Sequence, residues 1–340
     1  MNVTIKDVAK KAGVSIATVS LVLHKSNRIS TVTRNKVLKA IKELNYHPSR
    51  SAKGLVTRTT GNIGFVLTED HFLRTEPFYT KIFLGTEFVT RDNDYYVLLS
   101  TIKREFHEDD PLPRFILEKN VDGIIIAGKV PNLFISKLSK YKIPLVFVDY
   151  YPPQGDYNVV LIDNIKGGFL ATKYLIELGH KDIAFVGGDI THPSITDRFI
   201  GYKQALESSG LSINPDIIIT DEDYPSRANG YDAANRLLNQ SKNITAIFAC
   251  NDAMALGILQ YCYDNGIKVP DDISIVGFDD VESDISSTPQ LTTIRVPKTE
   301  LGIEAMNLMV NLLKEKEKFQ TRKILVPVEL IIRTSTRKIK

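Results

Sequence analysis

The strongest constraint on the fold lies near the start of the chain, where two short helical patterns flank Gly13. The first pattern has the i, i+3, i+4, i+7 spacing of one apolar helix face and consists of Ile5, Val8, Ala9 and Ala12. Thr4 precedes it as a helix cap, Gly13 supplies a tight turn, and Ser15 can cap the next helix. The inner face of that second helix consists of Val19, Val22 and Leu23. The stretch therefore predicts a helix-turn-helix.

A third helix is predicted to begin after Ser30 and to complete a small apolar core. The side chains expected to close this core are Val32, Val37, Leu38, Ile41 and Leu44. Residues 1 to 60 carry twelve basic side chains against two acidic ones, a net charge of +10, whereas the whole chain carries +3. The remainder therefore carries −7, and a basic head on an acidic body indicates nucleic-acid binding by the head.

From residue 62 onward, apolar strand patterns alternate with amphipathic helix patterns, as in parallel α/β sheets. The first series of predicted strands covers 63–67, 96–100, 123–127 and 144–148, with helices centred near Gly85, Phe115 and Ser136. The second series covers 183–186, 217–220, 246–250 and 273–278, with helices that begin near Asn164, Thr196, Arg227 and Asp252. With 340 residues, the chain has room for both α/β halves beside the head.

Short motifs along the whole chain resemble those of the LacI/GalR family of bacterial transcription regulators. In the head they are TIKDVA (4–9), GVS (13–15), TVS (18–20), Thr33-Arg34, Val37 and ELNY (43–46). In the body they are VDGII (121–125), Asp163-Asn164, GHKDIAF (179–185), RFIGY (198–202), Asn251-Asp252 and GFDD (277–280). The resemblance covers essentially all 340 residues.

The resemblance implies an all-α helix-turn-helix DNA-binding head at 1–46, a hinge helix and linker at 47–61, and an effector-binding and dimerisation core at 62–340. The core is expected to be α/β and periplasmic-binding-protein-like, with two doubly wound parallel-sheet lobes. One lobe would comprise about 62–162 and 293–323, and the other about 163–292 and 324–340. In the family the chain crosses between the lobes three times, here near Ile162, Thr292 and Ile324.

The second helix of the head, at residues 15–23, is expected to enter the major groove of a palindromic operator. We expect Ile16, Ala17 and Leu21 to read bases. Many relatives carry polar or basic side chains at the position of Leu21, and an apolar residue there contacts thymine methyl groups rather than guanine edges. Phosphate contacts are expected from Thr4, Ser15, Thr18, Asn27, Arg28 and Arg34. Ser20 and Lys53 complete the expected DNA contacts.

Composition alone identifies residues 47–61 as a linker. In the family this segment is a hinge helix that orders on specific DNA, pairs with its dimer mate and inserts a leucine into the minor groove. Leu55 stands at that position, and such an apolar wedge unstacks a base step and bends the duplex. Ser49, Ala52 and Gly54 are small enough for two hinge helices to approach each other closely. The alternative is that Leu55 packs against the core.

Polar and aromatic side chains follow the predicted strands, at the edge where open α/β sheets bind ligands. The residues expected to contact an effector are Phe78, Tyr79, Asp163, His192, Ser194, Arg198, Tyr224, Asn251 and Asp279. Carboxylates, an arginine fork and aromatic faces together suit a sugar. Asp163, Asn251 and Asp252 fit equally well as helix caps, and Tyr224 as a core residue. Residues 71–77 depart from the family pattern beside Phe78, which leaves the effector class open.

Other protein classes find little support. Only two cysteines occur, Cys250 and Cys262, too far apart for a CxxC motif, so neither a disulfide framework nor a zinc site is expected. No apolar run approaches the roughly 18 residues of a membrane span, and the amino terminus does not resemble a signal peptide, so we expect a soluble, cytoplasmic protein. No HExxH, GxGxxG or GxxxxGK[ST] motif occurs, so neither a cofactor, a metal nor enzymatic activity is expected.

We therefore expect a homodimeric repressor of a carbohydrate-use operon, whose operator affinity is controlled by a small sugar-like effector between the core lobes. A first alternative is a regulator that depends on a purine or phosphoprotein co-repressor. A second is a solute-binding protein that only traps a ligand, although the basic head speaks against it. A sugar-processing enzyme is a third, and no convincing acid–base pair supports it.

Overall fold

The computed structural model describes residues 3–23, 26, 28–46, 59–72, 78–222, 225–241, 243–315 and 320–339. The chain divides into two compact units, Met1–Gly61 and Asn62–Lys340. Hinge residues 47–58, which include Lys53 and Leu55, lie outside the described residues, as do His24, Asn27 and Tyr224. In the described part of the chain, no helix is both long and apolar enough to span a membrane.

The head contains α1 (Ile5–Ala12), α2 (Ile16–Leu23) and α3 (Thr31–Glu43). Gly13 ends α1 in the left-handed conformation, with φ 66°, which glycine adopts without a Cβ penalty. The hydroxyl oxygen of Ser15 accepts a hydrogen bond from the backbone N–H of Thr18 at 3.1 Å, and that of Ser30 from the N–H of Thr33 at 3.3 Å. The predicted helix-turn-helix and its two serine caps are confirmed.

Thr4 caps α1 as predicted, in a capping box with Asp7: its backbone N–H and its hydroxyl both donate to Oδ2 of Asp7, at 2.8 and 2.6 Å. The predicted core of the head is wrong at Val32 and Leu38, whose side chains are 68% and 49% exposed. The packing face of α3 instead follows one stripe with i, i+3, i+4, i+7 spacing, made of Val37, Ala40, Ile41 and Leu44. Val32 and Leu38 fall outside that stripe.

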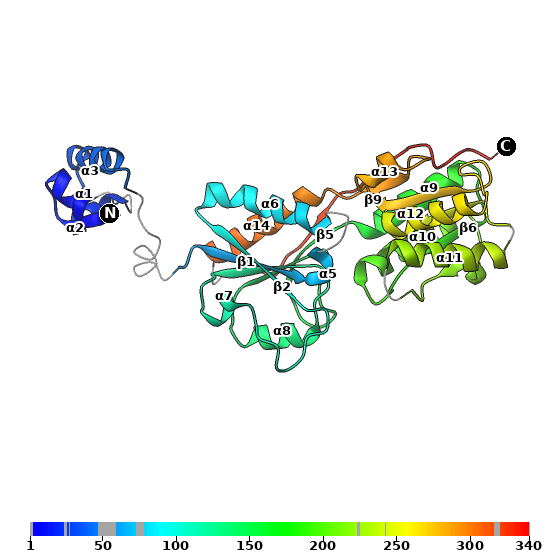
Figure 1. Ribbon diagram of the computed structural model, residues 1–340, viewed down its shortest axis with the longest axis horizontal. Helices are drawn as coiled ribbons and strands as arrows, with labels where there is room; N and C mark the ends of the chain where they lie inside the picture. Colours follow the sequence, from blue (N-terminus) through cyan, green and yellow to red (C-terminus); the bar gives the residue numbers. More distant parts are fainter. Residues whose placement is uncertain are drawn as a thin grey trace. The chain divides into compact units, whose positions relative to one another are not determined.

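The second unit contains two lobes, each built on a sheet that has six strands among the described residues. The first sheet is entirely parallel, in the order β11-β5-β4-β3-β1-β2. Its strands are β1 (Asn62–Thr68), β2 (Tyr96–Ile102), β3 (Gly123–Ala127), β4 (Leu145–Val148), β5 (Asn158–Ile162) and β11 (Lys323–Val326). Around it lie α5 (Glu69–Phe72), α6 (Phe78–Asn93), α7 (Arg114–Leu117), α8 (Asn132–Ser139) and α14 (Lys298–Lys314). Figure 1 shows α6 and α14 on one face of this sheet and α7 and α8 on the other.

The second sheet has the order β12-β10-β9-β8-β6-β7, and only its edge pair β10–β12 is antiparallel. Its strands are β6 (Ile183–Val186), β7 (Ile218–Ile219), β8 (Ala246–Ala249), β9 (Ser274–Asp279), β10 (Thr292–Arg295) and β12 (Glu329–Ile331). Its helices are α9 (Asn164–Glu177), α10 (Pro193–Ser208), η1 (Pro215–Ile217), α11 (Arg227–Gln240), α12 (Asp252–Asp264) and α13 (Ser283–Ser286). The two doubly wound lobes predicted for the core are thus present.

Two crossings between the lobes fall a few residues later than predicted. β10 pairs with β9 through Arg295, so the chain leaves the second sheet after Arg295 rather than near Thr292. β11 pairs with β5 through Val326, so the last crossing follows Val326 rather than Ile324. In both cases the strand stays paired with its neighbour up to its last residue, and the crossing follows that residue. An apolar pattern alone does not reveal which sheet a strand joins.

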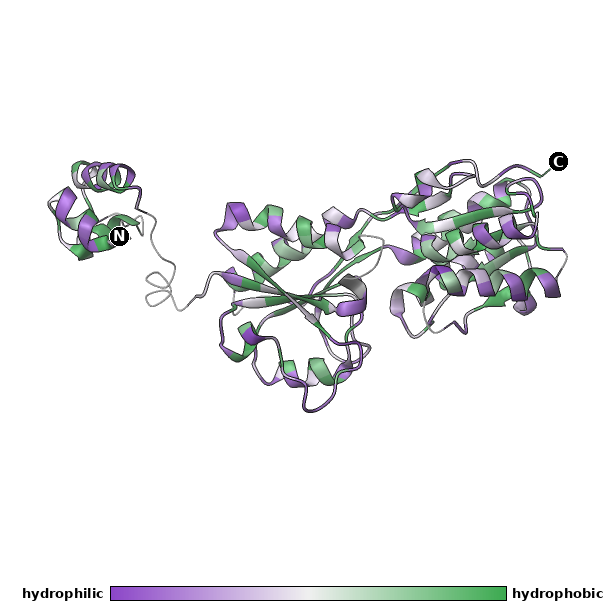
Figure 2. Cartoon of the chain, viewed as in Figure 1, coloured by the Kyte–Doolittle hydropathy of each residue, from purple (hydrophilic) through white to green (hydrophobic). Residues whose placement is uncertain are grey.

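The central strands of both lobes are apolar and buried, whereas the helices are amphipathic, as the hydropathy colouring in Figure 2 shows. Every residue of β3, β6 and β8 is buried. Close helix contacts depend on glycine pairs: a Cβ at Gly85 of α6 would overlap the backbone carbonyl of Thr299 in α14, and one at Gly302 would overlap that of Ile82. α6 and α14 therefore pack backbone to backbone.

Candidate functional site

A cavity of about 250 Å³ lies between the two lobes, at the carboxyl ends of their strands. Seven of the nine residues predicted for an effector site line it: Phe78, Tyr79, His192, Ser194, Arg198, Asn251 and Asp279. Asp163 caps α9 instead, where its Oδ1 accepts the backbone N–H of Lys166 at 3.0 Å. The rule that ligands bind beyond the strand ends therefore locates the cavity, while Asp163 fits its helix-cap alternative.

Arg198 is the buried cation of the cavity, with 5% of its surface exposed. Its Nε donates to Oδ1 of Asn164 at 2.9 Å, and its Nη1 donates to the carbonyl oxygen of Cys250 at 2.6 Å. The guanidinium also stacks on the ring of Phe278, with Cζ 3.7 Å from the ring centroid. These contacts fix the plane of the guanidinium, which is the condition for directional recognition by an arginine fork.

Asp279 lies at the end of β9 with φ 125°, a conformation that strains any side chain with a Cβ. Its Oδ1 lies 3.6 Å from Nη1 of Arg198 and accepts no hydrogen bond from the described residues. Burial raises the pKa of Asp279 to about 7, with the carboxylates of Asp252 and Asp149 adding to the rise and Arg198 and Lys298 opposing it. The cavity therefore contains a carboxyl oxygen that is free to accept a hydrogen bond from a ligand.

Asp149 follows β4 and was not among the predicted site residues. It is buried, with φ 62°, and its Oδ2 accepts the hydroxyl of Tyr79 at 2.9 Å. Its backbone carbonyl accepts the hydroxyl of Ser194 at 3.1 Å, a hydrogen bond that joins the two lobes. Asp149 and Asp279 thus bring carboxyl groups to the cavity from opposite lobes.

Lys129 and Asp189 were also missed, and they join the lobes at the cavity. Nζ of Lys129 lies 2.7 Å from Oδ2 of Asp189 and donates to the hydroxyl oxygen of Thr191 at 3.0 Å. Burial opposes ionisation of Asp189, but Lys129 and the hydrogen bonds from Thr191 outweigh it and lower its pKa to about 2. Lys129, Asp149 and Asp189 all follow strands closely, so extending the strand-end rule to every strand would have found them.

Asn251 and His192 both line the cavity and cap helices. Oδ1 of Asn251 accepts the N–H of Met254 at 2.9 Å, and its Nδ2 donates to the carbonyl oxygen of Pro225 at 2.9 Å. Nδ1 of His192 accepts the N–H of Ser194 at 3.3 Å at the start of α10. The helix-cap alternative therefore describes Asn251 as well as the cavity position does.

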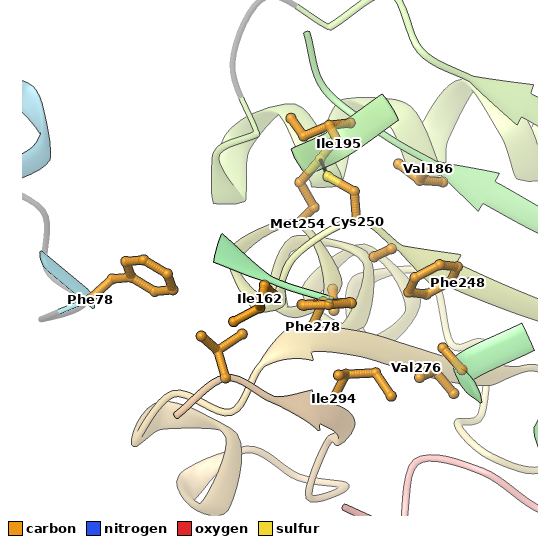
Figure 3. Close-up of a cluster of buried hydrophobic side chains, with 14 of the residues drawn as sticks. Phe78, Ile162, Val186, Ile195, Phe248, Cys250, Met254, Val276, Phe278 and Ile294 are labelled. Carbon is orange, nitrogen blue, oxygen red and sulfur yellow. Dashed lines mark hydrogen bonds between the residues drawn. The ribbon is translucent and has the colours of Figure 1, made fainter. Parts of the chain in front are cut away.

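Phe78 and Tyr79 give the cavity an apolar wall from the first lobe. Their rings meet edge to face, with centroids 5.0 Å apart. Figure 3 shows Phe78 at one side of the apolar cluster, with its ring directed toward Ile162 and Phe278. The wall offers aromatic faces for the C–H surface of a ligand, opposite the charged groups of the second lobe.

The head presents an apolar outer face on α2. Ile16 and Leu21 are 44% and 39% exposed. Of the other predicted DNA contacts on this helix and its cap, Ser15 and Ala17 are exposed and Thr18 and Ser20 are half-buried. Thr4 and Arg28 are exposed, while Arg34 donates from Nη2 to the carbonyl oxygen of Ser26 at 2.6 Å and so braces the turn before α3.

Comparison with known proteins matches both units. Residues 4–49 match the model for bacterial regulatory proteins of the lacI family, and residues 172–336 match that for a periplasmic binding protein-like domain. The HTH-type transcriptional repressor PurR of Histophilus somni is 35% identical over 336 residues, which cover 98% of this chain and 99% of that protein.

Solved structures of transcriptional regulators match nearly the whole chain. A complex of the transcriptional regulator CelR with cellobiose matches with TM-score 0.75 and 28% identity, covering 98% of this chain and 100% of that one. The lac repressor dimer bound to operator and the anti-inducer ONPF matches with TM-score 0.78 and 26% identity, covering 99% and 100%.

A helix-turn-helix head joined to a two-lobed core with a cavity defines a DNA-binding transcriptional regulator rather than an enzyme. The chain belongs to the LacI family of bacterial regulatory proteins, as a transcriptional repressor. Repressors of this family bind DNA operators and small-molecule effectors.

Proposed function

We propose that this repressor controls a carbohydrate-use operon and that a small sugar-like effector binds in the cavity between its lobes. The observation that carries the proposal is the pair of carboxyl groups, Asp149 and Asp279, that reach one cavity from opposite lobes beside the buried Arg198. Carboxylates accept hydrogen bonds from hydroxyl groups, the arginine fork donates to oxygens, and the ring of Phe78 suits a C–H face. A polyhydroxylated ligand satisfies all three.

A purine effector is the second candidate. Relatives that match over nearly their whole length carry the name PurR, which suggests a purine, whereas the CelR neighbour holds cellobiose. The edge-to-face pair of Phe78 and Tyr79 provides an aromatic wall against which a flat heterocycle can pack. The two candidates differ in the number of hydrogen bonds that they can donate to the carboxyl groups. A sugar offers many hydroxyl donors, whereas a purine base offers only a few N–H groups.

For the DNA side, we propose that α2 enters the major groove, with Ile16, Ala17 and Leu21 at the bases and Leu55 of the 47–61 hinge in the minor groove. Exposure of the Ile16 and Leu21 side chains supports the first part, while Leu55 lies outside the described residues. A palindromic operator requires two heads, hence a homodimer. We expect the protein in the cytoplasm, where its operator is.

A candidate dimer surface lies on the first lobe. Leu84 and Phe88 stand one turn apart on α6 with 45% and 48% of their surfaces exposed, and Tyr96 on the edge strand β2 is 61% exposed. Apolar side chains of this size gathered on neighbouring elements are characteristic of a protein interface. This surface supports the homodimer in which the core, residues 62–340, provides both dimerisation and effector binding.

The effector acts in this proposal by its different affinity for two lobe arrangements. A coupling free energy of about 1–3 kcal/mol changes operator affinity by roughly 5- to 150-fold. An effector that contacts both Asp149 and Asp279 has an affinity that depends on the lobe arrangement, because each lobe supplies one carboxyl group.

Fluorescence anisotropy tests the proposal directly. The full chain is titrated into a palindromic operator with a central CG step and into a scrambled duplex, with and without monosaccharides, disaccharides and purine bases. We expect specific operator binding that one sugar changes at least fivefold. A change produced only by a purine base would establish the second candidate, and no change with any compound would reject both.

The hinge assignment has its own variant. Leu55→Ala should lose the preference for the operator and retain salt-sensitive binding to the scrambled duplex, because phosphate contacts are unaffected. Normal operator binding by this variant would show that Leu55 is not a minor-groove wedge.

A further inference from the structure

Lys298 occupies an unusual position for a lysine. It is the first residue of α14, and only 6% of its surface is exposed. The N-terminus of a helix favours anions, so both burial and the helix dipole disfavour an ammonium group there. Burial lowers the pKa of Lys298, and the nearby carboxyls of Asp279 and Asp252 oppose that shift. A group held against such costs must make strong compensating contacts.

Those contacts join the two sides of the cavity. Nζ donates to the backbone carbonyl oxygen of Asp279, and to that of Asp280 at 3.1 Å. Both aspartates have positive φ, 125° and 55°, so Lys298 holds the strained turn from which the Asp279 carboxyl enters the cavity. The same Nζ lies 5.6 Å from the ring centroid of Phe78, which lines the opposite wall.

The backbone on either side of Lys298 is held by contacts with both lobes. Gly85 and Gly302 bring α6 and α14 into backbone contact, which fixes Lys298 relative to Phe78 at the start of α6. On the other side, the N–H of Val296 donates to the carbonyl oxygen of Asp279 at 3.3 Å. Lys298 therefore belongs to the first lobe by its helix and holds the second lobe by its ammonium group, directly after a crossing between the lobes.

We propose that Lys298 is a positioning residue of the effector site, which sets the Asp279 turn of the second lobe against Phe78 of the first and so couples cavity occupancy to lobe arrangement. The proposal rests on the proposed function in that it assumes an effector in this cavity. It assigns Lys298 no direct contact with the effector. Removing the ammonium group should release the turn, and with it the Asp279 carboxyl, without changing the identity of any side chain that lines the cavity.

Three full-length variants test it. Lys298→Met removes the charge and the donors at similar length, and Lys298→Arg keeps both. Lys314→Met makes the same change at the other end of α14, where the side chain is exposed and Nζ lies 3.5 Å from Oδ1 of Asn93. Each is titrated calorimetrically with cellobiose, glucose, adenine and guanine, and with operator DNA in the presence and absence of the compound that binds the wild-type chain.

We expect Lys298→Met to bind that compound about tenfold more weakly, as the loss of a charge-assisted hydrogen bond implies, and to lose most of the effector-dependent change in operator affinity. The variant should still prefer the operator to a scrambled duplex without the compound, since no residue of the head is changed. Lys298→Arg should restore binding to within about threefold, and Lys314→Met should match the wild type. Wild-type affinity in Lys298→Met, or equal losses in the Met and Arg variants, would overturn the proposal.

Amide hydrogen exchange tests Lys298 even if no compound in the panel binds the wild type, which would be a failure of the proposed function alone. In the ligand-free chain, Lys298→Met should exchange faster than wild type in peptides covering residues 78–84 and 278–284, and outside these only beside the substitution itself. Lys314→Met should exchange like wild type in both. Unchanged exchange in these peptides, or a rise throughout the core, would show that Lys298 does not position the turn.

Discussion

The outer face of α2 and the cavity between the lobes depart in opposite directions from the usual distribution of side chains. On α2, the apolar residues Ile16 and Leu21 are 44% and 39% exposed. In the cavity, Arg198 and Asp149 are each only 5% exposed. Exposed apolar groups lose nothing when a partner covers them, whereas buried charges require partners within the fold. The exposed apolar face of the head therefore suits contact with a large partner such as DNA, and the buried charges of the cavity suit a small ligand.

The largest expected effect concerns the buried charge. Arg198→Ala leaves Oδ1 of Asn164, the carbonyl of Cys250 and the Asp279 carboxyl without their cation. We expect the free energy of unfolding to fall by about 3–5 kcal/mol and effector binding to be lost. Urea unfolding measures the first and calorimetry the second.

Arg114→Ala is the matched control, because Arg114 pairs with Glu118 at the surface, with 88% and 49% of the two side chains exposed. It should cost at most about 1 kcal/mol. If both variants lost the same free energy of unfolding, the buried cation of the cavity would be no different from a charge at an ordinary surface.

The next effect concerns the apolar face of the head. Leu21→Ala should weaken specific operator binding about tenfold, since apolar contacts with bases are lost, and should leave binding to a scrambled duplex unchanged. The melting temperature should not fall, because Leu21 lies on the outer face. Leu38→Ala, on α3 with 49% exposure, is the control and should alter neither quantity. A similar loss of operator binding in both variants would refute base reading by Leu21.

A smaller effect concerns the pH dependence of stability. The pKa of Asp279, about 7 in the fold, lies above the ordinary value of 3.8, so between these values the native state holds a proton that the unfolded chain has released. The contribution of Asp279 to stability is therefore lost as pH rises from 4 to 7.

Asp279→Asn should remove this dependence and be more stable than wild type at pH 8 by about 1–3 kcal/mol, with little difference at pH 4. Denaturant titrations at several pH values measure it. Parallel curves for the two proteins would mean that the Asp279 carboxyl is ionised in the fold.

The smallest effect concerns the ion pair that joins the lobes. Lys129 and Asp189 have side chains that are 42% and 30% exposed, so Lys129→Ala should lower the free energy of unfolding by about 0.2–1 kcal/mol, and less at high salt. Lys103→Ala, whose ion pair with Asp110 lies within one lobe, is the control for the loss of a surface pair. If effector affinity changes in Lys129→Ala and not in the control, the pair bears on lobe closure.

The same contrast explains what the sequence could reveal. In the head, the helix caps and the turn depend on residues close together in the sequence, so the roles of Gly13, Ser15 and Ser30 were predictable. Only the exposure of the Val32 and Leu38 side chains was not predicted. In the core, alternating patterns predicted four of the six strands that each sheet has among the described residues. Sheet membership at the crossings after Arg295 and Val326 depends on pairing between distant strands, which local pattern does not specify.

For the cavity, the strand-end rule found Arg198 and Asp279, but the pairings that define the site are long-range. Tyr79 meets Asp149 across 70 positions, and Lys129 meets Asp189 across 60. No local signal distinguishes Asp163, which caps a helix, from Asn251, which caps a helix and also lines the cavity. The positive φ of Asp149 and Asp279, a strong sign of a functional turn, appears only in three dimensions.

The most direct test of the central claim, that the cavity controls the head, is the reciprocity of the two binding equilibria. Operator affinity is measured with and without the compound identified in the panel, and the affinity for that compound is measured with and without operator. Linkage requires the two ratios to be equal, and we predict a common factor of roughly 5 to 150. A compound that binds the free and the operator-bound chain equally well would show that the cavity and the head are not coupled.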